Sequence, residues 1–156
     1  MGPVYAYFAA RPWEAGLYTL TGNGGTQVGP FSVSTNFPAE FTVTDWDSVA
    51  AINRAVPLTL HWTGSGFQRV TILVSSNRVT GSILRIVNIN CENMPTSLGT
   101  YTIPPETLSY LLTGAANLTI EAINQATFTA PLVPEGQTDI GMFNVDLGVD
   151  KQLPVQ

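Results

Sequence analysis

Leu58-Thr59-Leu60-His61-Trp62-Thr63-Gly64 is the stretch that decides the fold class of this chain of 156 residues. Its two leucines and its tryptophan alternate with two threonines and the histidine. Successive side chains of an extended strand point to opposite faces, so this order gives one apolar face and one polar face. The stretch therefore predicts a half-buried β-strand, and the glycines that follow it predict a turn.

Alternation with a period of two residues continues beyond this stretch. Residues 70–75 repeat it, and we expect them to form a hairpin with residues 58–63. Residues 83–90 change register, because Leu84 and Ile86 have one parity and Val87 and Ile89 the other. Either a bulge lies near Ile86, or both faces of this strand are covered.

One segment has the features of a helix. Pro104-Pro105 followed by Glu106 suits a first helical turn, and Gly114 suits the end of a helix, so residues 105–112 are predicted to form a helix of two turns. Beyond it, residues 118–122 and 126–130 are expected to be strands joined by a turn at Asn124-Gln125. Residues 138–147 complete the set as the closing strand.

The pattern T-x-(V/I)-G-x-F-x-V occurs twice, at residues 26–33 and 138–145. Its spacing suggests a repeating unit of about 110 residues, a usual size for one β-sandwich. We therefore expect residues 1–34 to be an N-terminal extension and hairpin, from the tail of a preceding unit or from exchanged strands. Residues 35–150 are expected to form the sandwich domain, and residues 151–156 a tail.

Four segments resemble an immunoglobulin-like module common in large, uncharacterised secreted proteins of soil acidobacteria. The resemblance covers most of residues 16–147 and rests on strand and turn residues, listed here: Tyr18-Thr19-Leu20-Thr21-Gly22, Val28-Gly29-Pro30-Phe31, Leu58 to Gly64 and Tyr101-Thr102-Ile103-Pro104. It implies an extracellular or cell-surface setting in a larger protein, and no catalytic motif. With the turn-bounded short strands, it predicts an all-β fold, an antiparallel two-sheet immunoglobulin-like sandwich with one short helix near 105–112.

Composition excludes several kinds of partner. Charged residues make up 11% of the chain, well below the roughly 25% of an ordinary protein, and the formal net charge is −5. Because Lys151 and five scattered arginines form no basic patch, we expect no binding to nucleic acid. No run approaches the ~20 apolar residues that cross a bilayer, so no membrane insertion is expected.

The chain offers little catalytic chemistry. His61 is its only histidine and falls on the polar side of its strand, where a surface residue is the ordinary interpretation. Cys91 is its only cysteine, which excludes a disulfide within the chain and favours a small buried apolar residue over a thiol nucleophile paired with His61. We expect no enzyme, no cofactor and no metal site.

A ligand site is conceivable around Asp45-Trp46-Asp47. Its two carboxylates suit calcium, but an Asp-rich turn around a packed tryptophan explains them as well. Trp13 and Trp46 are the candidates for an exposed sugar-stacking platform, whereas Trp62 shares the parity of core leucines.

The expected function is a non-enzymatic extracellular module with a structural, adhesive or assembly role. Contacts with other protein domains, or self-association, are expected through the N-terminal strands, and the predicted assembly residues are Tyr18, Leu20, Val28 and Phe31. The alternative is a carbohydrate-binding module that holds a polysaccharide with exposed aromatic side chains.

Overall fold

The computed structural model describes residues 14–26, 28–131 and 138–156. Three antiparallel sheets account for most of this part of the chain, with strand orders β1-β2, β3-β4-β7 and β6-β5-β8-β9. The all-β prediction is confirmed. The elements are β1 (Gly16–Gly22), β2 (Phe31–Phe37), β3 (Phe41–Val43), η1 (Trp46–Ser48), β4 (Leu58–Gly64), β5 (Arg69–Thr80), β6 (Ile83–Pro95), η2 (Thr96–Leu98), β7 (Thr100–Ile103), α1 (Pro105–Leu108), β8 (Gly114–Pro131) and β9 (Thr138–Val155).

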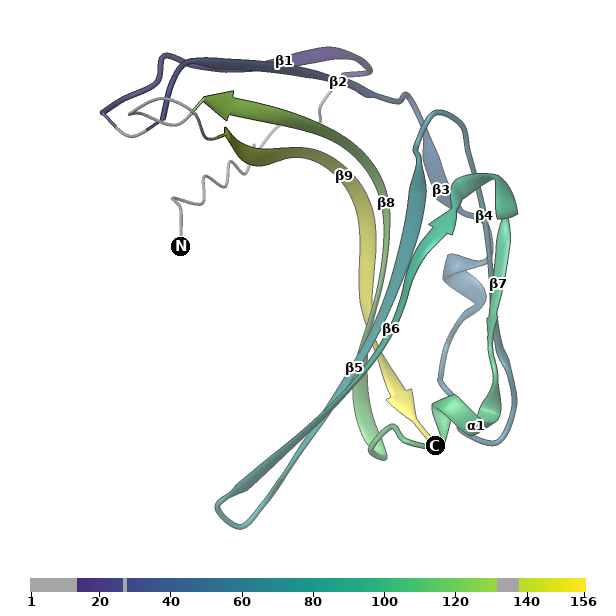
Figure 1. The fold of residues 1–156 in the computed structure, drawn as a ribbon. Coiled ribbons are helices and arrows are strands. Elements are labelled where there is room, and N and C mark those ends of the chain that lie inside the picture. Colours follow the sequence, from purple (N-terminus) through teal and green to yellow (C-terminus); the bar gives the residue numbers. More distant parts are fainter. Residues whose placement is uncertain (1–13, 27, 132–137) are drawn as a thin grey trace.

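The main sandwich packs the three-stranded sheet against the lower half of the four-stranded sheet (Figure 1). Each strand contributes alternate side chains to the core, as the sequence pattern predicts. In β4 the inward side chains are Leu60 and Trp62, and the Trp62 Nε1–H donates to the Thr96 carbonyl oxygen at 2.9 Å. The opposite sheet contributes the side chains listed here: Val70, Ile72, Val74, Leu118, Ile120 and Ala122.

Strands β8 and β9 are much longer than predicted and bend away from the main sandwich (Figure 1). The β1–β2 hairpin covers their far halves, where the Phe31 and Phe128 rings stack with centroids 4.6 Å apart. The expected turn at Asn124-Gln125 is wrong, because β8 runs through it. Asn124 is buried there, and its side chain donates to two backbone carbonyl oxygens and accepts from one backbone N–H.

The predicted hairpin between residues 58–63 and 70–75 is also wrong. β4 pairs with β3 and β7, whereas β5 pairs with β6 and β8, so the two strands belong to opposite sheets. The segment that joins β4 to β5 crosses from one sheet to the other, and its Phe67 side chain is buried. Alternation cannot separate these topologies, because both bury the same face of each strand.

Three predicted boundaries need correction. The helix α1 has four residues in place of the predicted span 105–112, because one turn followed by tight turns already buries Leu108 and Leu111. Residues 151–155, expected to be a tail, continue β9, and Leu153 and Val155 lie in the core. β2 crosses the boundary placed at residue 34.

Neither alternative for residues 83–90 is correct. The β5–β6 register shifts between Val70 and Ile72, where Asn93 on β6 has a φ of 59°, and not near Ile86. Ile83, Leu84 and Ile86 are exposed, so the strand is not covered on both faces. Among the described residues, no helix is long and apolar enough to cross a membrane.

Candidate functional site

The outer part of the β5–β6 hairpin, residues 77–87, projects beyond the sandwich, and we call it the arm (Figure 1). Pairing of β5 with β8 ends at Ser76, opposite Ala116, so the arm is a ribbon of two strands. Four large apolar side chains on it are 58% to 67% exposed: Val79, Ile83, Leu84 and Ile86. Exposed apolar side chains grouped in this way mark interaction sites.

The register of the arm divides its side chains between two faces. Val79 is directly opposite Leu84 and Arg78 is directly opposite Arg85, and opposed residues of an antiparallel pair share a face. Neighbouring pairs alternate between faces, so Val79 and Leu84 form an apolar face. Arg78 and Arg85 share the other face with Ile83.

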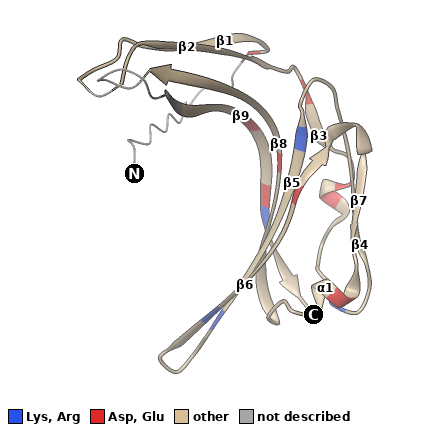
Figure 2. Ribbon diagram, in the orientation of Figure 1, with Lys and Arg blue, Asp and Glu red and all other residues tan. Residues whose placement is uncertain are grey.

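The two arginines stand beside each other without a carboxylate. Residues 77–87 contain no Asp or Glu, and Figure 2 shows the arm carrying positive charge alone. Arg78 donates to the Thr113 carbonyl oxygen at 2.7 Å and to the Thr113 hydroxyl. The Arg85 guanidinium forms no hydrogen bond or ion pair with any residue in the described ranges. Like charges directly opposite each other destabilise a strand pair.

A hollow of about 260 Å³ opens between the arm and the loop that precedes β8. Its lining combines two cations with apolar walls, contributed by Arg78, Thr80, Ile83, Arg85 and Leu112. Such a lining suits an anionic side chain that carries an aliphatic stem. A carboxylate brought here would relieve the repulsion between the guanidinium groups.

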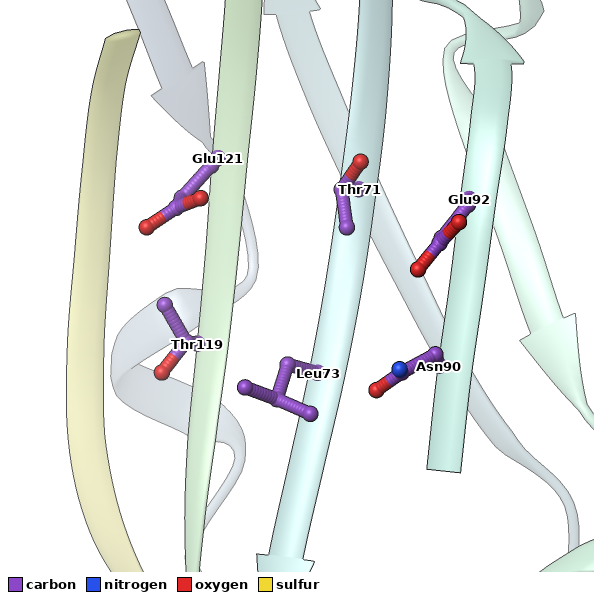
Figure 3. A pocket seen from close by; sticks show the side chains of 6 residues that line it. All are labelled: Thr71, Leu73, Asn90, Glu92, Thr119 and Glu121. Carbon is purple, nitrogen blue, oxygen red and sulfur yellow. The ribbon is translucent and has the colours of Figure 1, made fainter. Parts of the chain in front are cut away.

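The outer face of the four-stranded sheet, turned away from the core, carries a second and shallower hollow of about 150 Å³. Figure 3 shows its two rows of side chains, with Thr71 between Glu121 and Glu92, and with Leu73 between Thr119 and Asn90. The hollow therefore has two carboxylates at the ends of one row and one apolar side chain, Leu73, in the middle of the other row. These side chains come from three neighbouring strands, β8, β5 and β6.

Negative charge accumulates on this outer face. Partial burial and the nearby Asp146 carboxylate raise the pKa of Glu121. Partial burial also raises the pKa of Asp146, and the Arg69 guanidinium offsets part of that rise. Burial thus disfavours the charged form of both carboxylates, and the Asp146 charge adds to this effect at Glu121.

Asp45 and Trp46, two of the predicted ligand-binding residues, both have partners within the chain. The Asp45 Oδ2 lies 2.9 Å from the His61 Nδ1, and its Oδ1 accepts from the His61 backbone N–H at 3.1 Å. Partial burial raises the Asp45 pKa, but these hydrogen bonds outweigh it and hold the pKa below its ordinary value of 3.8. Lys151 Nζ donates to the Trp46 carbonyl oxygen and lies 4.6 Å from the centre of the Trp46 ring.

The other predicted ligand residues do not complete a site. Asp47 is exposed, and among the described residues no three His, Cys, Asp or Glu side chains are grouped to hold a metal ion. Trp13 lies outside the described residues. Because Lys151 covers part of the half-buried Trp46 ring, a sugar-stacking platform would depend on Trp13.

The predicted assembly residues are spread over the N-terminal hairpin. Phe31 stacks on Phe128 of β8, and the Tyr18 ring meets Phe37 edge to face at 6.1 Å between centroids. Val28 is half-buried, and Leu20 is 42% exposed. The hairpin thus buries part of its apolar surface within its own chain.

His61 and Cys91 are not brought together. The His61 ring lies on the exposed side of β4, whereas Cys91 on β6 packs against the core. Burial raises the pKa of the Cys91 thiol, and a hydrogen bond with the Tyr101 side chain offsets part of the rise. A raised pKa lowers the thiolate fraction, which makes this cysteine a weak nucleophile.

The arm was missed because its irregular pattern resembles that of a strand covered on both faces. A signal was present, since Arg78 and Arg85 lie symmetrically about Gly81-Ser82 among apolar residues. A covered strand would not carry two arginines at such positions. No protein-family model, curated protein or solved structure matches the chain.

Proposed function

We propose that this chain is a non-enzymatic, extracellular structural and adhesive module, and that it assembles with other protein chains through the arm. The observation that carries this proposal is the group of exposed apolar side chains on the arm: Val79, Ile83, Leu84 and Ile86. Isolated two-stranded ribbons are at best marginally stable in water. Burial against another chain would remove this apolar surface from water and hold the ribbon in place.

The interaction site lies on the arm, whereas the N-terminal hairpin mainly packs against its own chain. The hairpin buries Val33 and Phe37 and stacks Phe31 on Phe128, whereas most of the arm projects beyond the sandwich (Figure 1). The extracellular setting rests on the resemblance of the strand and turn residues to immunoglobulin-like modules of secreted proteins.

The test replaces the exposed apolar side chains of the arm while keeping its strand propensity. A variant with Val79→Thr, Ile83→Thr, Leu84→Thr and Ile86→Thr is compared with wild type by sedimentation velocity over a range of concentrations. A control variant with Val56→Thr and Leu98→Thr changes exposed apolar residues elsewhere.

We expect wild type and the control to form oligomers as concentration rises, and the arm variant to remain monomeric with an unchanged circular dichroism spectrum. The proposal is wrong if the arm variant associates as wild type does, or if wild type stays monomeric.

A further inference from the structure

We infer that the partner of the arm is a second copy of this chain, which receives the arm on the outer face of its four-stranded sheet. In this arrangement Arg78 and Arg85 of one copy meet Glu92 and Glu121 of the next. The inference rests on the proposed function and adds to it the identity and the surface of the partner.

Charge complementarity is the first argument. The arm holds two cations that face each other across the ribbon with no carboxylate in the same segment. The outer face holds Glu92 and Glu121 on either side of its hollow, with Asp146 near enough to Glu121 to raise its pKa. Docking would place each group of like charges beside the opposite charge.

Shape and apolar surface supply the second argument. Ile83 lies on the arginine-bearing face of the arm and is 61% exposed. The receiving hollow has Leu73 among its polar side chains and a volume of about 150 Å³. Because a cavity of this size can hold a benzene molecule, it offers enough space for the Ile83 side chain. Ile83 belongs to the next residue pair on the same face as Arg78 and Arg85. Leu73 lies in the row next to that of Glu92 and Glu121 (Figure 3), so each surface has an apolar residue beside its charged pair.

The arm cannot dock on the hollow of its own chain. The arm and the hollow share strands β5 and β6, and Thr80 on the arm is seven residues beyond Leu73 of the hollow on β5. At ~3.3 Å per residue this separates them by about 23 Å along the strand. The hollow that receives the arm must therefore belong to another molecule.

This contact joins two different surfaces of the same chain, so it is heterologous. Every copy that inserts its arm still offers its own outer face to a further copy. Contacts of this kind close into a ring or continue as a filament, according to the rotation between neighbours. Either product suits a module with a structural role.

A charge exchange tests the inference with two single substitutions, Arg85→Glu and Glu92→Arg. Neither side chain forms an ion pair within the described part of the chain, and Glu92 is exposed. Each variant alone would place like charges at the contact and associate at least about tenfold more weakly than wild type. An equimolar mixture of the two would restore association, as would the double variant, because opposite charges then meet again.

The measurements are sedimentation velocity of each variant, the mixture and the double variant, with Glu14→Arg as a control charge change on exposed surface. A mixture and a double variant that stay as weak as the single variants would overturn the inference. Arm-dependent association that both single variants leave unchanged would also overturn it, while the proposed function would stand.

Vesicles containing an anionic lipid provide the remaining arm of the experiment. Binding of wild type to these vesicles that Arg85→Glu abolishes, without self-association at any concentration, would overturn the inference in favour of a lipid surface. Restoration by charge exchange together with no vesicle binding supports a second copy as the partner.

Discussion

Replacing Asn124 by alanine tests whether one buried side chain joins the N-terminal hairpin to the main sandwich. The Asn124 Nδ2 donates to the carbonyl oxygens of Asn36 and Gly66, each at 2.9 Å. Its Oδ1 accepts from the Gln68 backbone N–H at 2.8 Å. These partners lie on β2 and on the connection from β4 to β5. The side-chain amide of Asn124 therefore joins the N-terminal hairpin and this connection to β8.

The cost follows from which groups lose their partner. The Gln68 N–H also donates to the Ile123 carbonyl oxygen at 3.1 Å and remains satisfied. The carbonyls of Asn36 and Gly66 each lose a charge-neutral hydrogen bond in a partly buried setting, at roughly 1 to 2 kcal/mol apiece. Asn124→Ala should therefore lower the free energy of unfolding by about 2 to 4 kcal/mol.

Urea unfolding followed by tryptophan fluorescence measures this loss as a fall in the midpoint. Asn117→Ala is the matched control, because Asn117 lies on the same strand but is exposed. Asn124→Asp should cost more than Asn124→Ala at neutral pH, since a carboxylate would face two carbonyl oxygens. A loss under 0.5 kcal/mol for Asn124→Ala, a value taken as the scale of an ordinary surface change, would refute the reasoning.

Three further predictions follow from the same structure. Leu153→Ala should lower the free energy of unfolding by about 2 to 5 kcal/mol in a urea titration, whereas the exposed neighbour Gln152→Ala should leave it nearly unchanged. A Leu153→Ala effect as small as that of Gln152→Ala would show that the end of β9 is dispensable for stability. The raised pKa of Glu121 means that its stability contribution is complete below the ordinary value of 4.5 and is lost as pH rises through the folded pKa. Glu121→Gln should therefore raise the melting temperature at pH 7 and have no such effect at pH 3, and a gain equal at both pH values would contradict this cause. Phe31→Ala should remove the stacking on Phe128 and speed amide hydrogen exchange in β1 and β2, while the main sandwich stays protected. An equal increase of the exchange rates in the hairpin and in the main sandwich would contradict a hairpin that opens by itself.

Local pattern was sufficient for the strands of the main sandwich. Leu60 and Trp62 are buried while His61 is exposed, as their alternation predicts, because the two sides of a strand sample different surroundings. The hairpin expected in the N-terminal extension is likewise present, as the antiparallel pair of β1 and β2. These features depend only on neighbours in sequence.

The pairing of strands required tertiary information. β4 and β5 looked like a hairpin because both bury one face, and only the packing of the layers shows that they belong to opposite sheets. Asn124 looked like a turn residue because it is polar, yet distant backbone groups satisfy it inside β8. Propensity describes a residue in isolation, and long-range hydrogen bonds can outweigh it.

The sequence by itself determined that this protein is an antiparallel β-sandwich with a hairpin before it, because alternation of polar and apolar residues directly encodes one buried and one exposed face. Only the tertiary structure decided that residues 77–87 project as an uncovered arm and that Glu92 and Glu121 flank one hollow. The exposure of the arm depends on where the neighbouring strand ends, and the pairing of β8 with β5 ends at Ser76. The two arginines on either side of Gly81-Ser82 are a signal of exposure in the sequence. No pattern within β5 or β6 records where β8 ends, so the extent of the arm could be seen only in the folded chain.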